Sequence, residues 1–475
     1  IMICYGESAS EALDVEMCYY KEKAATVETI PRKRAFRYLF VPDVAKEEIE
    51  IEAIHESLPL TNHAAFSSDN VLLNKIWEVS VETFTLCSGL FFIDGIKRDR
   101  WIWSGDAYQS YFINQYLFFD EEINTRTMLA LRGQNEIKQH MNTIVDYSIL
   151  WIIAVENHYL MTGDTVFLKQ IYPKMKTMMD YLQAQTNELG FIYGREKDWL
   201  FIDWREMDRE GTLAAEQILL LKAYQTMMTC GAVLGEVDDY EQKYQQLKEN
   251  VMSYFWDEEK QAFIDSYESK KRHVTRHANI FAILFDLVEQ EKKEQILTHV
   301  LLNPEITQIT TPYFKFFEQD ALCKMGQTDQ VYQIICDYWG GMVERGAVTF
   351  WEEYIPEETG EQVYEMYGDP FGKSLCHAWG ASPIYLLGRY FAGVRPLSPG
   401  YQTFVVEPDL AAFESLNMQI PIKNGLVTIN KEQEQLRIST TREGGILRIN
   451  QQEVHLEPGK NYDISLETTK SKQLI

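Results

Sequence analysis

The amphipathic pattern of residues 69–390 limits the folds that this chain can adopt. Apolar side chains recur there with the period of an α-helix in twelve successive segments, most of them joined by short links. The segments predicted to be helical are 71–89, 105–118, 122–140, 147–161, 164–187, 211–233, 236–254, 275–287, 289–301, 312–325, 327–340 and 373–390. Twelve helices in succession favour six hairpins closed into a ring, the (α/α)6 barrel. A helical solenoid and a bundle are the alternatives, and the sequence lacks the fixed-period self-similarity of a solenoid.

Patterns typical of β-strands flank the helical region. Segments 35–41 and 49–57 alternate β-branched or aromatic residues with polar ones, which predicts strands from the end of a β-sandwich. After Gly393 the period becomes two, and short strands are separated by turn pairs at Asn424-Gly425, Gly444-Gly445 and Pro458-Gly459. We therefore predict a mainly α protein with three domains. These are a partial N-terminal β-sandwich (1–65), an (α/α)6 barrel catalytic domain (66–392) and a C-terminal antiparallel β-sandwich (393–475).

The charge of the chain excludes some classes of partner. Its formal net charge is −26, which disfavours nucleic acid and anionic membrane surfaces and suits a neutral ligand such as a sugar. No apolar run reaches the roughly 18 residues that a membrane helix needs. The sequence does not indicate an oligomeric state.

The cysteines and the first residues bear on cellular location. The seven Cys are scattered and include no CxxC pair, so neither a metal site nor a disulfide framework is predicted. Reduced thiols favour a cytoplasmic location. Residues 1–10 do not resemble a signal peptide, and the alternative is that the sequence begins within a domain whose upstream part is missing.

The strongest functional motif is IDGIKRDRWIWSGDAYQS, residues 93–110. It combines three acids with basic and tryptophan side chains: Asp94, Asp99, Asp106, Lys97, Arg98, Arg100, Trp101 and Trp103. A solvated charged loop is the alternative, but the interleaved tryptophans and the lack of any regular period favour a site. A neighbouring Arg would keep one carboxylate ionised, and contact with Trp would raise the pKa of another. A glycosidase needs two carboxyl groups in such different states.

Further candidates lie in other loops. Glu352 follows Trp351 in AVTFWEEYIPEE (347–358) and is the best candidate for a second carboxylate, whereas Glu357 and Glu358 fit a surface acidic run. Two segments that do not show a helical period, 188–210 and 341–372, are rich in aromatic and acidic residues, as binding loops often are. Additional sugar contacts are predicted for the pair Asp203 and Trp204, for Trp351 and for His377, although a lone His is as often a core residue. No GxSxG, HExxH, GxGxxG or Walker motif is present.

Three motifs in this order resemble a known family. DGIKRDRWIWSGD (94–106), TFWEE (349–353) and SLCHAWGASPIYLL (374–387) are similar to motifs of the bacterial α-L-rhamnosidases of glycoside hydrolase family 78. The resemblance implies an inverting hydrolase that releases terminal α-L-rhamnose, with a β-sandwich, an (α/α)6 barrel and a second β-sandwich. It implies that Glu352 is the general base and that Asp94 and Asp106 bind rhamnose.

The resemblance also assigns the remaining roles. Asp99 stands at the general-acid position, where the family usually has Glu, and Arg98, Trp103 and His377 match sugar-contacting positions. No cofactor is expected, and an inverting pair of carboxyl groups should lie about 6.5–9.5 Å apart. Two alternatives stay open: a hydrolase of the same fold acting on another sugar, and an inactive carbohydrate-binding relative. Both follow if Arg100, not Asp99, occupies the acid position.

Overall fold

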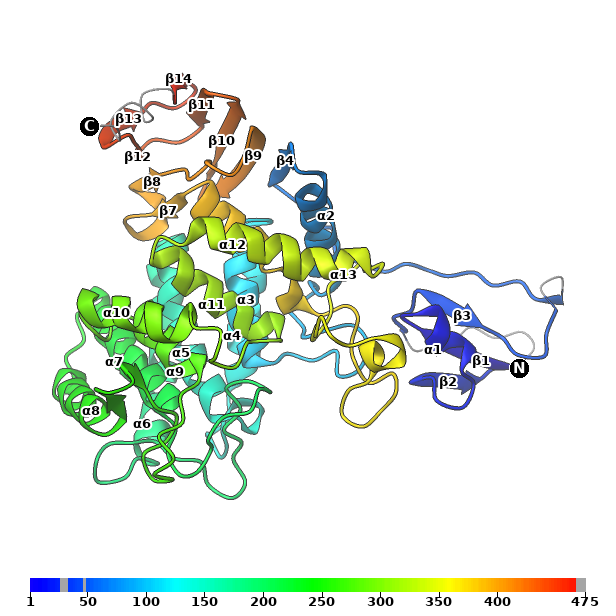
Figure 1. The fold of residues 1–475 in the computed structure, drawn as a ribbon, viewed down its shortest axis with the longest axis horizontal. Helices are drawn as coiled ribbons and strands as arrows, with labels where there is room; N and C mark the ends of the chain where they lie inside the picture. Colours follow the sequence, from blue (N-terminus) through cyan, green and yellow to red (C-terminus); the bar gives the residue numbers. More distant parts are fainter. Residues whose placement is uncertain (26–32, 46–47, 467–475) are drawn as a thin grey trace.

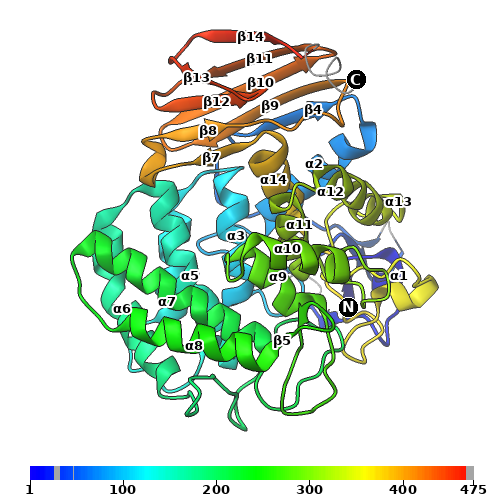
Figure 2. The same ribbon diagram turned by 60° about the vertical axis from the view of Figure 1, so that its left-hand side comes forward.

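Helices form the middle of the molecule and sheets lie at two of its ends (Figures 1 and 2). The computed structural model describes residues 1–25, 33–45 and 48–466. The long helices are α2 (Val71–Leu86), α3 (Ser104–Gln115), α4 (Glu121–Arg132), α5 (Val145–Thr162), α6 (Thr165–Gln183), α7 (Ala214–Leu234), α8 (Tyr240–Phe255), α9 (Arg276–Leu284) and α11 (Pro312–Lys324). The short ones are α10 (Gln290–Ile296), α12 (Thr328–Ile334), α13 (Gly340–Glu344) and α14 (Pro383–Leu386). Each of the predicted helical segments overlaps at least one of these helices.

Local signals explain where several helices begin and end. The side chains of Asn70, Asp120 and Asp164 accept hydrogen bonds from backbone N–H groups in the first turns of α2, α4 and α6. α5 and α7 end at Gly163 and Gly235, which have φ angles of 68° and 72°. These capping groups satisfy backbone atoms that the helices leave unpaired.

Two helix predictions were too long. The predicted segment 122–140 ends as a helix at Arg132, because Gly133 adopts φ 64° and ψ −165° and turns the chain away. The segment 373–390 is not α-helical before Pro383; it begins as an irregular stretch, followed by a single 3-10 turn at Ala378–Ala381. The backbone groups of that stretch bond to other parts of the chain instead of to each other.

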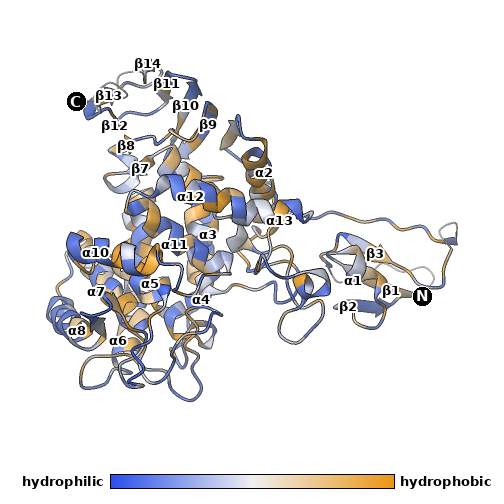
Figure 3. Ribbon diagram, viewed as in Figure 1, coloured by the Kyte–Doolittle hydropathy of each residue, from blue (hydrophilic) through white to orange (hydrophobic). Residues whose placement is uncertain are grey.

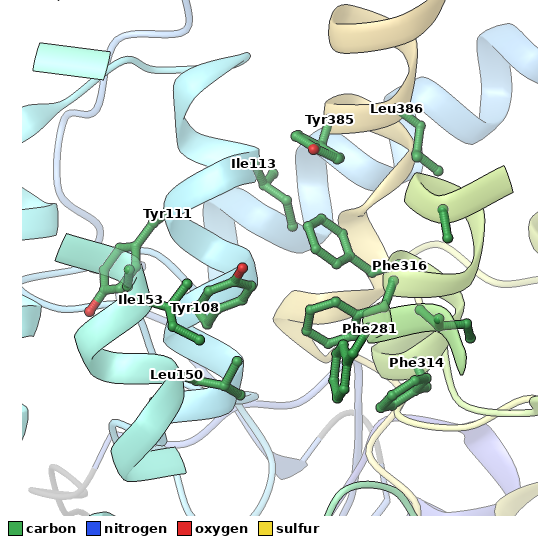
Figure 4. Close-up of a cluster of buried hydrophobic side chains, with 14 of the residues drawn as sticks. Tyr108, Tyr111, Ile113, Leu150, Ile153, Phe281, Phe314, Phe316, Tyr385 and Leu386 are labelled. Carbon is green, nitrogen blue, oxygen red and sulfur yellow. The ribbon is translucent and has the colours of Figure 1, made fainter. Parts of the chain in front are cut away.

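Buried and amphipathic helices alternate along the chain. α5 and α7 are buried on nearly all sides and pack against each other, and α5 also packs against α3. α8 buries only one stripe, which includes Tyr240, Tyr244, Leu247 and Val251, and is otherwise hydrophilic (Figure 3). Between the buried helices lies an aromatic core (Figure 4), in which ring centroids of Phe316 and Tyr385 are 4.9 Å apart.

The N-terminal residues form a small sheet with one short helix. β1 (Met2–Gly6) lies between β2 (Tyr20–Lys23) and β3 (Tyr38–Phe40), and both pairs are antiparallel. The described residues among 1–45, which include these strands and α1 (Ala9–Leu13), are called the N-terminal unit below. The predicted strand in 35–41 is confirmed as β3. The predicted strand over 49–57 is wrong, because these residues are exposed and pair with no strand in the part of the chain that the structure describes.

Two further sheets lie together at the C-terminal end (Figure 2). Their strands are β4 (Ala65–Ser68), β7 (Val394–Pro396), β8 (Phe404–Val406), β9 (Ser415–Ile422), β10 (Gly425–Glu432), β11 (Gln435–Thr440), β12 (Gly445–Ile449), β13 (Gln452–Leu456) and β14 (Asn461–Ser465). The sheet orders are β14-β11-β10-β9-β4 and β13-β12-β8-β7. β5 (Trp256–Asp257) and β6 (Ala262–Phe263) form a separate two-stranded hairpin.

The C-terminal strands were predicted to be antiparallel throughout, and this prediction is wrong for one pair of strands. β8 and β12 are parallel, with Ile446 opposite Val405, because the chain forms β9, β10 and β11 in the other sheet before it returns. β4 comes before all the long helices and pairs with β9, so the start of the helical region is tied to the C-terminal sheet. None of the helices within the described ranges is long and apolar enough to cross a membrane.

We predict that Gly388→Ala destabilises the helical core. A methyl group at Gly388 would lie 2.2 Å from Cδ1 of Tyr116, a fully buried ring whose hydroxyl donates to the carbonyl of Val394. Overpacking of this kind costs about 1–3 kcal/mol of unfolding free energy, measured by urea denaturation. Gly89→Ala is the control, because its added methyl would meet only one atom at 3.9 Å. Equal stability of the two variants would contradict the prediction.

Candidate active site

Residues from four loops and two helices line a cavity of about 220 Å³. Its lining consists of Asp94, Arg98, Asp99, Trp103, Asp106, Ile144, Tyr147, Trp199, Phe201, Trp204, Glu352, Tyr367, His377 and Trp379. All the site residues predicted from the sequence are among them except Asp203 and Trp351. The first motif is therefore a neighbour in space of Glu352 and His377, although both of these residues lie more than 240 positions after it in the chain.

Glu352 is buried and held by three donors. Its Oε1 accepts from Nη2 of Arg98 at 2.5 Å and from the hydroxyl of Tyr367 at 2.9 Å, and its Oε2 accepts from the backbone N–H of Ser374 at 3.0 Å. Burial alone would raise the pKa of Glu352, but the nearby His377 and Arg98 and these hydrogen bonds outweigh it and lower the pKa. Glu352 is thus an ionised carboxylate within the cavity wall.

His377 provides the second positive group of the site. Its Nε2 lies 3.1 Å from Oδ1 of Asp106, and its ring centroid lies 4.0 Å from that of Trp379, with the two planes tilted by 39°. Burial lowers the pKa of His377, but the hydrogen bond to Asp106 and the charges of Glu352, Asp106 and Asp94 more than offset burial and raise it. Because Asp106 begins α3 and His377 follows an irregular stretch, only tertiary packing brings this pair together.

The remaining acids differ sharply in environment. Asp94 is 5% exposed and accepts from the backbone N–H of Trp101 at 3.0 Å, and burial raises its pKa to about 7. Asp99 is exposed at the cavity and makes no hydrogen bond with the part of the chain that the structure describes. The cavity therefore contains an ionised carboxylate, a buried carboxyl group with a pKa of about 7, and an exposed acidic side chain at its edge.

Aromatic rings form a continuous wall. Ring centroids are 4.9 Å apart for Trp199 and Phe201, 4.9 Å for Phe201 and Trp204, and 6.2 Å for Trp204 and Tyr367. Trp204 also lies 5.3 Å from Trp379. Phe201 and Trp379 are fully buried, whereas Trp199 and Tyr367 are 48% and 60% exposed. The wall thus runs from the interior of the cavity to its mouth, and both of its outer ends are open to solvent.

One irregular segment, residues 372–378, connects the parts of the site. Arg98 donates to the carbonyl of Gly372. The N–H of Ser374 donates to the side chain of Glu352, and the carbonyl of Ser374 accepts from the backbone N–H of Glu352. The N–H of Ala378 donates to the carbonyl of Asp94 at 2.7 Å. These contacts join the segment to motifs elsewhere in the chain and use backbone groups that a helix would pair internally, which explains why the predicted helix does not form here.

Asp203 and Trp351 do not occupy the predicted positions. Asp203 is fully buried and accepts from the hydroxyl of Thr311 and from the backbone N–H of Trp204, both at 2.8 Å. It anchors the loop of Trp204 from behind. Trp351 is also buried and borders a different cavity of about 870 Å³, beside residues of the N-terminal unit. Direct sugar contact by these two side chains does not fit this geometry.

Several lining residues were missed from the sequence. Trp199 and Tyr367 lie in the two aromatic-rich loops that were singled out, but nothing in those loops marked these rings among their neighbours. Tyr367 has φ 58°, a conformation that is uncommon for residues other than Gly. Ile144, Tyr147 and Phe201 follow ordinary core patterns, so only the fold identifies them as cavity residues.

Comparisons with known proteins agree with this arrangement. The family model of the bacterial alpha-L-rhamnosidase six-hairpin glycosidase domain matches residues 61–391. An alpha-L-rhamnosidase of Alteromonas sp. (strain LOR) is 25% identical over 401 residues, which is 75% of this chain and 40% of that protein. The chain spans less than half the length of the curated relatives that it matches.

Two solved structures share the fold. A GH78 family rhamnosidase of Bacillus sp. GL1 superimposes with a TM-score of 0.73 at 24% identity, covering 83% of this chain and 43% of that one. A rhamnosidase from Klebsiella oxytoca with rhamnose bound gives a TM-score of 0.68 at 23% identity, covering 82% and 81% of the two chains. The mixed arrangement of helices and sheets is therefore that of known rhamnosidase structures.

We predict that Arg98→Met lowers the free energy of unfolding, and that the loss is larger at pH 7, where Glu352 is ionised, than at pH 4. The pKa of Glu352 is lowered in the folded state, so the stabilisation is present above its unfolded pKa of about 4.3 and is lost as pH falls through the folded value. Removing the partner of a buried carboxylate costs about 3–5 kcal/mol at pH 7. Urea denaturation at pH 7 and pH 4 should show a smaller deficit at pH 4. The same deficit at both values would contradict an ionised Glu352.

Proposed function

The chain belongs to the bacterial α-L-rhamnosidase six-hairpin glycosidase family, and from this premise we propose that it hydrolyses glycosides to release terminal α-L-rhamnose. The main support is the convergence of four carboxyl groups on one small, aromatic-walled cavity. Their environments differ as general acid–base hydrolysis requires, because one is held ionised and others can hold a proton.

Glu352 is the proposed general base. Arg98, Tyr367 and Ser374 donate to its two oxygens and keep the carboxylate ionised and oriented. An ionised carboxylate has about four lone-pair directions, so three donors leave one to accept a proton from the attacking water. The water then attacks the anomeric carbon, and the bond from that carbon to the leaving oxygen breaks.

Asp99 is the proposed general acid. It lies at the exposed edge of the cavity, where the leaving oxygen of a bound glycoside would be. In this position the carboxyl group can donate its proton to the leaving oxygen as the glycosidic bond breaks. Asp94, Asp106 and His377 are buried deeper, and we assign them to the hydroxyl groups of the sugar, with Arg98 and Trp103 as further contacts.

The size of the cavity favours a terminal sugar. Drug-sized ligands occupy about 300–1,000 Å³, and this cavity of about 220 Å³ is smaller, so it suits one sugar ring. Trp204 and Trp379 offer apolar faces to the ring and to its C6 methyl group. The leaving group then lies at the mouth, over Trp199 and Tyr367, which suits an aryl group or a second sugar with a flat apolar face.

The finer features of the architecture and reaction belong to the same proposal. We propose that the helices close as six hairpins into an (α/α)6 ring and that the two C-terminal sheets pack as a sandwich. The domain limits remain 1–65, 66–392 and 393–475, with β4 shared between the first two. Hydrolysis proceeds with inversion and needs no cofactor, and the cytoplasmic location stays a prediction.

We predict that Glu352→Gln lowers kcat for aryl α-L-rhamnosides about 10²–10⁴-fold, the usual contribution of a general base. The loss should be equal for good and poor leaving groups, because water activation is affected and not departure. In the wild type, proton NMR of the first product should show β-L-rhamnose, the inverted anomer. Full activity of Glu352→Gln would remove this residue from the mechanism, and α-L-rhamnose as first product would exclude inversion.

The matched variant Asp99→Asn separates acid from base. It should retain most activity toward nitrophenyl rhamnosides, whose leaving group needs little protonation, and lose about 10²–10⁴-fold toward alkyl or sugar rhamnosides. If Asp94→Asn shows this pattern and Asp99→Asn does not, Asp94 is the acid. Hydrolysis of other aryl glycosides but not of rhamnosides would contradict the proposed sugar.

We predict that Trp199→Ala weakens binding of the leaving group. Loss of one stacking contact of about 0.5–1.5 kcal/mol raises KM about 2–10-fold for rhamnosides with aryl or sugar leaving groups. Binding of free rhamnose, measured by calorimetry, should not change. Trp101→Ala is the control, because Trp101 is 61% exposed but does not line the cavity. An equal rise in KM for Trp199→Ala and Trp101→Ala would contradict the proposal that Trp199 binds the leaving group.

A further inference from the structure

We propose that Glu7, in the N-terminal unit, is a positioning residue for the general base Glu352. Glu7 directly follows β1, and its side chain is only 8% exposed. Its Oε2 accepts a hydrogen bond at 2.6 Å from the backbone N–H of Leu375, a residue of the 372–378 segment. In Figures 1 and 2 the N-terminal unit lies beside the loop drawn in yellow that leads into this segment.

Two consecutive backbone amides link Glu7 to the catalytic carboxylate. The N–H of Leu375 donates to Glu7, and the preceding N–H of Ser374 donates to Oε2 of Glu352 at 3.0 Å. The carbonyl of Ser374 also accepts from the N–H of Glu352 at 2.9 Å. The peptide plane between Ser374 and Leu375 contains both the N–H that donates to Glu7 and the carbonyl that accepts from the N–H of Glu352. A shift of Leu375 would therefore move this carbonyl and, through the Cα of Ser374, the adjoining N–H that donates to the side chain of Glu352.

An ion cluster fixes Glu7 in place. Nζ of Lys97 lies 3.0 Å from Oε1 of Glu11 and 3.8 Å from Oε2 of Glu7, and all three side chains are buried. Lys97 also donates to the carbonyl of Lys373 at 3.4 Å, and the N–H of Glu7 donates to Glu11 at 2.9 Å. The cluster therefore joins the N-terminal unit to the first motif and to the 372–378 segment at once.

Stability alone does not account for this cluster. Two carboxylates share a single ammonium group, and Oε1 of Glu7 is buried without a hydrogen-bond partner among the described residues. Buried ion pairs are often no more stabilising than apolar residues of the same volume, and an unsatisfied buried oxygen is costly. A role in holding Leu375, and through it Ser374 and Glu352, explains why a carboxylate lies here.

The test compares Glu7→Ala and Glu7→Gln with Glu22→Ala. Glu22 is a matched control, because its carboxylate accepts from Tyr5 and Arg34 within the N-terminal unit. In Glu7→Ala we expect kcat to fall about 10-fold with KM changed less than about 2-fold, as when an outer partner of a catalytic group is lost. Glu7→Gln keeps an acceptor oxygen and should lose less, and Glu22→Ala should match the wild type.

The pH dependence of kcat/KM distinguishes a loss of Glu352 positioning from a general loss of rigidity in the protein. The Ser374 amide stabilises the ionised form of Glu352, so misplacing it raises the pKa of Glu352 and moves the acid limb of kcat/KM to higher pH. Glu7→Ala with an unchanged kcat and acid limb would overturn the proposal, as would an equal loss in Glu22→Ala. If Glu7→Ala does not fold, Glu7→Gln decides by the same two criteria.

The proposal rests on the proposed function, and one measurement separates their failures. Hydrogen exchange of the peptide containing Leu375 reports the contact whether or not a substrate is known. Faster exchange in Glu7→Ala than in Glu22→Ala supports the contact, and unchanged exchange overturns it. A wild-type protein that hydrolyses no rhamnoside but shows this exchange pattern would refute the function and leave the positioning of Glu352 by Glu7 in place.

Discussion

The backbone of the 372–378 segment is the constraint on which the site depends. Its carbonyl and N–H groups bond to Arg98, to Glu352 and to Asp94, which come from two loops far apart in the chain. A helix here would have used the same groups internally and left those loops unconnected. The segment 373–390, predicted as one helix, is therefore α-helical only from Pro383. Because residues 372–378 stay irregular, their backbone groups can hold together the loops that line the cavity.

The electrostatics of the cavity follow from an excess of buried acids over buried bases. Asp94, Asp106 and Glu352 share Arg98 and His377, so they cannot all be ionised at equal cost. Glu352 receives the direct guanidinium contact and has a lowered pKa, while Asp94 has only backbone donors and a pKa of about 7. Geometry, and not residue type, separates the carboxylate that is held ionised from the carboxyl groups whose pKa is raised.

Local signals predicted the elements that are stabilised locally. The apolar stripes placed most helices, whose first turns the structure shows capped by side chains such as Asn70 and Asp120. The turn pair Asn424-Gly425 placed the β9–β10 hairpin. The failures have tertiary causes. Segment 49–57 has the alternation of a strand but pairs with no strand among the described residues. The parallel pairing of β8 with β12 depends on the return of the chain from the other sheet.

By itself the sequence determined the chemical inventory: which loops contain acids and tryptophans, and that the first motif, Glu352 and His377 belong to one kind of site. Only the tertiary structure decided how each group is used. Asp203 and Trp351 are buried outside the lining of the cavity. The hydroxyl of Tyr367 donates to Glu352, and Glu7 accepts from the N–H of Leu375, which is 368 residues away in the chain. Periodicity and capping act over a few residues, whereas such contacts form only when distant elements pack, and no local pattern records them.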